Sequence, residues 1–249
     1  MPNKDESFYT GHRERLRAKY LAGQLADYEK LELLLSYPIP RRDVRPLARA
    51  LMARYKNIPN ILATPASELR NFRGLGESTL VFFQLLYDVS LMQYESVLSS
   101  QPIFHDPRTL GNYCRMLVAN KNVEEFHVLY LDGTHRLIDS FCHAVGSISY
   151  SPIVPRDIVT RAVQMGAHSV VLLHNHPKRT PYFSADDYII TQHIIDGLAV
   201  VDIVVIDHLL MVGGIIHCMN QNGFSFTNTL TSQTLPKGKD STILQVFPG

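Results

Sequence analysis

The spacing of hydrophobic residues divides the chain into two regions. Between residues 11 and 98, large apolar residues recur at intervals of three or four, as at Leu31, Leu34 and Leu35. Residues at this spacing share one face of an α-helix, so we expect this region to be mostly helical. Pro38 ends one such run, because proline does not continue a helix interior.

The pattern changes after residue 108, where short apolar runs of strand length alternate with helical patterns. We expect helices at 109–118, 155–166 and 184–198, and strands at 126–132, 136–143, 169–173, 200–206 and 209–212. Strands that alternate with helices indicate an α/β or α+β layer structure. The sequence therefore predicts an all-α region followed by an α/β domain.

Two polar stretches lie at the ends of these regions. Residues 96–108 contain paired serines and two X-Pro steps, and we interpret them as a linker that follows a helical domain at 1–98. Residues 227–249 are rich in Ser, Thr, Gln, Gly and Lys, so we expect a poorly ordered tail there.

Composition narrows the functional classes only slightly. The formal net charge is +1, which gives no whole-chain electrostatic reason to expect binding to nucleic acid or membrane. The three cysteines, Cys114, Cys142 and Cys218, are scattered, which fits reduced thiols in a cytoplasmic protein better than disulfides. We find neither a secretory signal nor an apolar run of about 18 residues that could span a membrane.

A glycine-containing turn, Gly74-Leu75-Gly76, lies between two short predicted helices. Glycine permits a positive φ, and the amides that open the second helix could meet a phosphate group. This pattern predicts a helix-hairpin-helix turn in which Gly74 and Gly76 bind phosphate, with DNA as the partner. A plain tight turn in a helical bundle explains the same short pattern, and the pattern alone favours that simpler interpretation.

The most informative stretch is His174-Asn175-His176-Pro177, at the end of a predicted buried strand. Residues i and i+2 of a strand point to the same side, so His174 and His176 can converge on one point. Asp187 follows in the first turn of a predicted helix. Two imidazoles and one carboxylate, with a fourth position open to water, are the ligands of a catalytic zinc site.

Two of the nearby motifs have simpler explanations. Ser184 and Asp187 fit a capping box, in which each side chain bonds the backbone of the other. The full pattern, with both histidines and the proline at fixed spacing, favours the metal site. Asp207-His208 could supply a partner for a ligand histidine or merely cap a strand end, and the sequence leaves both open.

A zinc hydrolase also needs a carboxylate that takes up a proton and passes it on. Glu124 and Glu125, which open the strand predicted at 126–132, are the first candidates. Asp132 and Asp139 are weaker candidates, because both adjoin turns or polar surface. The residues alone leave the choice among these acids open.

These residues resemble a known family. The pattern His174-x-His176-Pro-x6-Ser184-x-x-Asp187 is similar to the JAMM motif of MPN-type metalloproteases, and its surroundings resemble the bacterial RadC proteins more closely still. The similar surrounding segments include Glu124-x-Phe126-x-Val128-Leu129-Tyr130-Leu131-Asp132, Val154-Pro155-Arg156-Asp157-Ile158, Asp207-His208-Leu209 and Gly11-His12-Arg13-Glu14-Arg15-Leu16. The resemblance covers residues 11 to about 226.

The resemblance implies an MPN α/β fold, related to the cytidine deaminase fold, for residues 102–226, with a helix-hairpin-helix module before it. The Zn²⁺ ligands that it implies are His174, His176 and Asp187. It also implies that Glu124 is the general acid/base and that Ser184 donates a hydrogen bond to the developing oxyanion.

One loop departs from the RadC pattern. RadC proteins usually read Ser-Gly-x-Pro-x-Pro after His-Asn-His-Pro, whereas this chain has Lys178-Arg179-Thr180-Pro181-Tyr182-Phe183. The loop keeps its length, so the ligand geometry should survive. The added Lys178 and Arg179 would favour an anionic substrate or an acidic residue near the scissile bond.

Two functions follow. The first is a zinc-dependent hydrolase that cleaves a peptide or isopeptide bond. The alternative is a DNA-binding or DNA-processing protein of repair or recombination, including a metal-dependent nuclease. A scaffold with an inactive site ranks last because all expected ligand types are present, and a zinc deaminase is disfavoured because H-x-E and P-C-x-x-C are absent.

Overall fold

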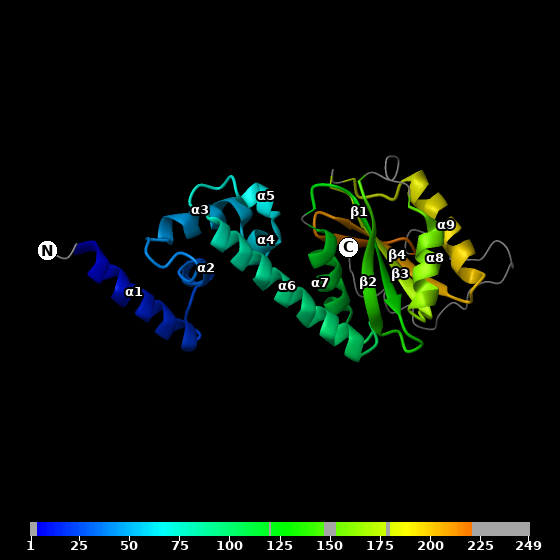
Figure 1. The fold of residues 1–249 in the computed structure, drawn as a ribbon, viewed down its shortest axis with the longest axis horizontal. Helices are drawn as coiled ribbons and strands as arrows, with labels where there is room; N and C mark the ends of the chain where they lie inside the picture. Colours follow the sequence, from blue (N-terminus) through cyan, green and yellow to red (C-terminus); the bar gives the residue numbers. More distant parts are fainter. Residues whose placement is uncertain (1–3, 120, 147–152, 178–179, 221–249) are drawn as a thin grey trace. The chain divides into compact units, whose positions relative to one another are not determined.

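A computed structural model describes residues 4–119, 121–146, 153–177 and 180–220. The chain divides into two compact units, Met1–Ser90 and Leu91–Gly249 (Figure 1). The tail predicted at 227–249 and the loop residues Lys178 and Arg179 lie outside the described residues. Among the described residues, no helix combines the length and the apolar character needed to cross a membrane.

The first unit is helical, as the apolar spacing predicted. Its helices are α1 (Lys4–Leu21), α2 (Asp27–Leu35), α3 (Arg45–Tyr55), α4 (Ile58–Ala63), α5 (Ala66–Leu69) and the first part of α6 (Glu77–Ser100). The apolar faces of α2 to α6 meet in one core, to which Leu31, Leu35, Leu51 and Phe83 each contribute an almost fully buried side chain. Leu16 of α1 lies in a smaller cluster of its own with Leu25 and Leu33. Each such side chain contributes about 1.5–3 kcal/mol to folding.

The polar stretch at 96–108 is not a linker throughout. Helix α6 continues to Ser100, and α7 begins at Pro107, so the prediction is wrong for residues 96–100. Leu98 and Ile103 are each 1% exposed because they belong to a core of the second unit. Burial of these side chains outweighs the preference of the neighbouring serines for turns.

The second unit is built on one five-stranded sheet. Its strands are β1 (Glu125–Leu131), β2 (Leu137–Val145), β3 (Ser169–Asn175), β4 (Val204–Val212) and β5 (Ile215–Cys218), in the order β2-β1-β3-β4-β5. β3 and β4 are parallel, and the other neighbouring strands are antiparallel. The helices of this unit are the last part of α6, α7 (Pro107–Val118), α8 (Pro155–Gln164) and α9 (Ala185–Ala199).

The sheet separates two apolar cores. Helix α7 packs on one face, where Leu129 and Val171 belong to its core. Helices α8 and α9 cover the other face, where Val128 and Leu172 belong to theirs (Figure 1). Successive residues of a strand point to opposite faces, so adjacent residues of β1 and β3 enter different cores. This is the mixed α/β layer structure that the sequence predicted.

The strands predicted at 200–206 and 209–212 are a single strand, β4, and the prediction of two is wrong. Val200 follows the end of α9 and is 72% exposed, so it lies outside the sheet. Asp207 and His208, which interrupt the apolar run, are buried within β4. Strand β5 was not predicted, because its four residues are too few to show a period.

Candidate metal centre

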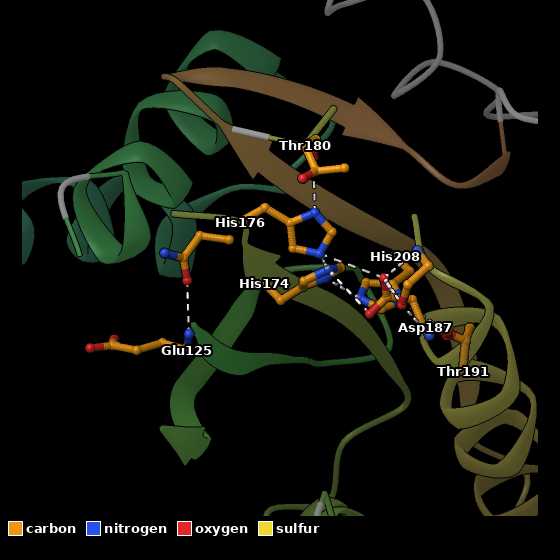
Figure 2. Close-up of polar contacts among 9 residues, drawn as sticks. Glu125, His174, His176, Thr180, Asp187, Thr191 and His208 are labelled. Atoms are coloured by element: carbon orange, nitrogen blue, oxygen red, sulfur yellow. Dashed lines mark hydrogen bonds and ion pairs between the residues drawn. The ribbon is translucent and has the colours of Figure 1, made fainter. Parts of the chain in front are cut away.

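The two histidines and Asp187 meet at one point, as their spacing predicted. β3 carries His174 and leads directly into His176, while the first turn of α9 carries Asp187. Nε2 of His174 lies 3.1 Å from Nε2 of His176 and 3.3 Å from Oδ1 of Asp187. Figure 2 shows the three side chains pointing toward one another. The histidine side chains are 2% and 11% exposed and that of Asp187 is fully buried, so the three groups meet largely away from water.

Asp187 uses its two carboxylate oxygens differently. Oδ2 accepts hydrogen bonds from the backbone N–H of Ser184 (2.6 Å) and from its hydroxyl (2.7 Å), and the backbone N–H of Asp187 donates to Ser184 Oγ (3.2 Å). This is the predicted capping box. Oδ1 is buried and faces His174, and no described residue donates a hydrogen bond to it. The cap therefore orients the carboxylate so that its other oxygen is available as a ligand.

A chain of hydrogen bonds fixes the nitrogen of His174 that carries the proton (Figure 2). The hydroxyl of Thr191 donates to the Asp187 carbonyl oxygen at 2.5 Å, because a carbonyl can only accept. Thr191 Oγ1 must then accept from Nδ1–H of His208 (2.6 Å), and Nε2 of His208 accepts from Nδ1–H of His174 (2.8 Å). Burial holds the pKa of His208 well below its usual value, which keeps its ring neutral. His174 is left with an unprotonated Nε2 that faces the other ligands.

His176 is held in a similar way. Its Nδ1–H donates to the Thr180 carbonyl oxygen at 2.9 Å, so Nε2 is the nitrogen that faces His174. The three potential ligand atoms lie within 4.8 Å of one another. Atoms that present lone pairs at such distances repel one another unless a cation lies among them. Burial lowers the pKa of His176, but its interactions with Asp187 and with the Thr180 carbonyl outweigh burial and raise it.

The residues fit a divalent metal ion. The backbone N–H and the hydroxyl of Ser184 donate hydrogen bonds to Oδ2 and so stabilise the ionised carboxylate of Asp187. A buried carboxylate oxygen without a hydrogen-bond donor, such as Asp187 Oδ1, is costly unless an ion compensates it. His174, His176 and Asp187 can therefore hold a metal ion and leave a position open to water, as in catalytic zinc sites.

Glu124 and Glu125 lie on opposite sides of the sheet, because successive residues of an extended chain alternate. Glu124 precedes Phe126 by two residues, and the ring of Phe126 stacks on that of His174, with 6.3 Å between centroids. Figure 2 shows the carboxylate of Glu125 pointing away from the metal ligands. The charge of Glu124 also contributes to the raised pKa of His176. Of the two glutamates, Glu124 is the one on the metal side.

The other two candidate acids have local partners. Asp132 closes the turn after β1, where its Oδ1 accepts the backbone N–H groups of Thr134 (2.7 Å) and Arg136 (2.9 Å). Asp139 lies on β2 and pairs with Arg161 at 3.4 Å. Because Asp132 is at the opposite end of β1 from Glu124, it is remote from the histidines.

Ser184 lies beside the ligands, with its hydroxyl engaged in the capping box. The residue itself is exposed to solvent. A hydrogen bond from Ser184 to an oxyanion, the role implied by the family resemblance, would require its O–H to turn away from Asp187.

Three further residues complete the site. Asn175 joins the start of β1 to the end of β3, since its Oδ1 accepts from Glu125 N–H (2.8 Å) and its Nδ2 donates to the Val123 carbonyl (3.1 Å). His208 is a partner of a ligand and lies inside β4, so of the two interpretations that the sequence allowed, the strand-end cap is wrong. Thr191 was missed, although it follows Asp187 by four residues, a spacing that places both on one helix face.

In the helical unit, the predicted glycine turn joins α5 to α6. Gly74 has φ +104°, a conformation that other residues rarely adopt, whereas the carbonyl of Gly76 accepts the backbone N–H of Leu80 at the start of α6. Glu77, in the first turn of α6, pairs with Arg70 at 3.3 Å. The carboxylate of Glu77 therefore lies at the start of α6, where the sequence predicted a phosphate group.

An open pocket of about 300 Å³ lies beside this turn. Its lining includes the apolar residues Ile39 and Leu47 together with Arg42, Arg73 and Gly74. Asp43 lines the same pocket and pairs with Arg45 at 2.9 Å, so two basic residues and one acidic residue surround a partly apolar space.

The substitution Thr191→Val tests the hydrogen-bond chain behind His174. It preserves side-chain shape but removes the bonds to His208 and to the Asp187 carbonyl. We expect Zn²⁺ affinity, measured by competition with a chelator, to fall roughly 10–100-fold. Thr64→Val, which removes a threonine bond to the Asn60 carbonyl in the helical unit, is the matched control. Equal affinities for the Thr191 variant and the unmodified protein would contradict the chain.

Comparison with protein families agrees with this geometry. A family model described as a RadC-like JAB domain matches residues 104–224. The matched segment contains all five strands, helices α7 to α9 and the three clustered ligands. Residues 104–224 therefore form a RadC-like JAB domain with the fold of JAMM-like metal-dependent hydrolases.

Proposed function

We propose that this protein is a zinc-dependent hydrolase of the JAMM type that cleaves a peptide or isopeptide bond. The observation that carries the proposal is the convergence of two imidazole nitrogens and one carboxylate oxygen on a shielded point. Nδ1 of each histidine makes a hydrogen bond, which leaves Nε2 of each ring free for a metal ion. Glu124, a carboxylate on the same side of the sheet, supplies the remaining group that hydrolysis needs.

The donor atoms support Zn²⁺ as the ion. Imidazole and carboxylate together suit Zn²⁺, and two histidines with one acidic residue are a ligand set of known zinc hydrolases. When bound, the ion would polarise the scissile carbonyl and lower the pKa of a water molecule to about 7.

The chain's own residues would then handle the proton. Glu124 takes the proton of the attacking water and delivers it to the departing amine as the C–N bond breaks. This role requires a carboxylate close to the ligands that is not itself a ligand. Ser184, once its hydroxyl turns from Asp187, donates a hydrogen bond to the oxyanion that forms on the carbonyl oxygen.

The substitution Glu124→Gln tests the assignment of the acid. We expect the rate of peptide or isopeptide hydrolysis to fall by roughly 10²–10⁴-fold, because glutamine cannot transfer the proton. Zinc content, measured by mass spectrometry of the purified protein, should stay unchanged, since Glu124 is not among the ligands. Asp132→Asn, an acid-to-amide change at the far end of the same strand, is the control and should keep full activity. A fully active Glu124→Gln protein would overturn the role.

A second function is favoured by the pocket beside the glycine turn. We propose that the helical unit binds the DNA backbone there through Arg42 and Arg73, with the turn at Gly74 and Gly76 allowing close approach. The Glu77–Arg70 pair opposes a phosphate at the α6 start, so the guanidinium groups supply most of the attraction.

DNA binding of this kind must weaken as salt rises. We expect Arg73→Ala to lower affinity for duplex or branched DNA and to reduce the slope of log K against log salt by about 0.9, the value for one phosphate contact. Arg54→Ala, which removes an arginine paired with Glu68 in the same unit, is the control and should leave the slope unchanged. A DNA affinity that does not change with salt concentration, or no binding at roughly micromolar DNA, would exclude this function.

A further inference from the structure

A second group of side chains with potential metal-ligand atoms lies on the sheet face opposite the candidate metal centre. Glu125 and His127 share one face of β1, and Cys142 of β2 is the residue directly opposite His127. A carboxylate oxygen, an imidazole nitrogen and the thiol sulfur of these residues lie within 4.8 Å of one another. We refer to these three residues as the β1–β2 cluster.

An irregularity in the β1–β2 ladder creates the cluster. Phe126 pairs with Ala144, so an unbroken antiparallel ladder would place His143 opposite His127. The register shifts at this point, and Cys142 takes that position instead. Bulges of this kind re-aim side chains, and here the bulge adds a sulfur ligand to an oxygen and a nitrogen ligand.

The cluster is sheltered yet reachable from solvent. The side chains of Glu125 and His127 are 12% and 9% exposed, and Cys142 is partly buried. Oε2 of Glu125 lies 2.9 Å from Nε2 of His127, while Oε1 lies 3.2 Å from Nζ of Lys121. Lys121 thus holds one carboxylate oxygen and leaves the other directed at the imidazole. This orientation is the one that a ligand carboxylate needs.

The thiol gains most from a metal ion. Burial, and then the negative charge of Glu125, raises the pKa of Cys142 above its ordinary value. A divalent cation among the three groups would remove this repulsion and release the thiol proton to solvent. Thiolate and carboxylate would together balance the two positive charges of the ion, and the imidazole would contribute a neutral lone pair.

We propose that Glu125, His127 and Cys142 bind a second Zn²⁺ ion, which links the start of β1 to the edge strand β2. Oxygen, nitrogen and sulfur donors from one carboxylate, one histidine and one cysteine are all zinc ligands, and the mixed set excludes Mg²⁺ and Ca²⁺, which require oxygen. A water molecule would complete the four ligands of such an ion. This proposal does not rest on the hydrolase function, because the two sites share no ligand.

Cobalt provides a test that separates the two sites. Co²⁺ substitutes for Zn²⁺, and only a cysteine ligand gives it a near-ultraviolet thiolate-to-metal charge-transfer band. The candidate metal centre contains no sulfur, so the band reports the β1–β2 cluster alone. We expect the full chain to show the band on addition of Co²⁺ and to lose it when Zn²⁺ is added in excess.

Matched variants define the expected outcome. Cys142→Ser and His127→Gln should each lose the band. Because each three-residue site holds one ion, each substitution should also lower bound zinc from about two ions per chain to about one. Asp187→Asn should keep the band, and Cys114→Ala, which alters a fully buried thiol of the same unit, should keep both band and stoichiometry. A band that persists in Cys142→Ser, or its absence from the full chain, would overturn the proposal.

The unsubstituted protein gives an independent check if a variant fails to fold. Added Zn²⁺ should slow alkylation of Cys142 at least tenfold, as followed by peptide mass spectrometry, because the metal-bound sulfur is not free to react. Alkylation of Cys142 at the same rate with and without Zn²⁺ would contradict the second site. Loss of zinc from the candidate metal centre alone would leave this protection intact, so the two sites can fail separately.

Discussion

The candidate metal centre depends on hydrogen bonds that hold protons away from it. Thr191, His208 and His174 form one directed chain, which begins at a carbonyl oxygen that can only accept. His176 is fixed separately by the Thr180 carbonyl. Both rings consequently turn Nε2 toward Asp187, and a divalent cation among the three groups would relieve the repulsion between their lone pairs. The same arrangement that makes the site unfavourable when empty makes it a strong ligand set when filled.

The fold builds this arrangement from elements that would form for other reasons. β3 and β4 are neighbouring parallel strands, and their register brings His208 beside His174. Both strands are largely buried. Helix α9 begins with a capping box that would stabilise any helix, yet one oxygen of the capping carboxylate remains free for the metal. Formation of the helix cap and formation of the site are therefore linked, because both use the carboxylate of Asp187.

Much of this could be predicted from the sequence because the signals are local. The two histidines at i and i+2, the capping box and most of the apolar periods lie within short segments, and the structure shows the geometry that they predict. The position of Glu124 relative to Glu125 also follows from strand alternation, once Phe126 is known to face His174.

The remaining features depend on contacts between distant segments. Asp207 and His208 look like a break in an apolar run, and only the burial of β4 shows that they are inside it. The pairing of His208 with His174, and of Cys142 with His127, arises from strand register, which no short segment encodes. The glycine turn could be recognised in the sequence. That the charge of Glu77 opposes a phosphate there follows only from its position in the first turn of α6.

The central claim is that one metal ion is shared by His174, His176 and Asp187, and anomalous X-ray diffraction at the zinc edge tests it most directly. Crystals of the full chain grown with Zn²⁺ should show a peak bonded to Nε2 of each histidine and to the Asp187 carboxylate, at about 2.0–2.2 Å. No zinc peak at this point under saturating Zn²⁺, or a zinc ion bound through Nδ1 of either histidine, would contradict the account.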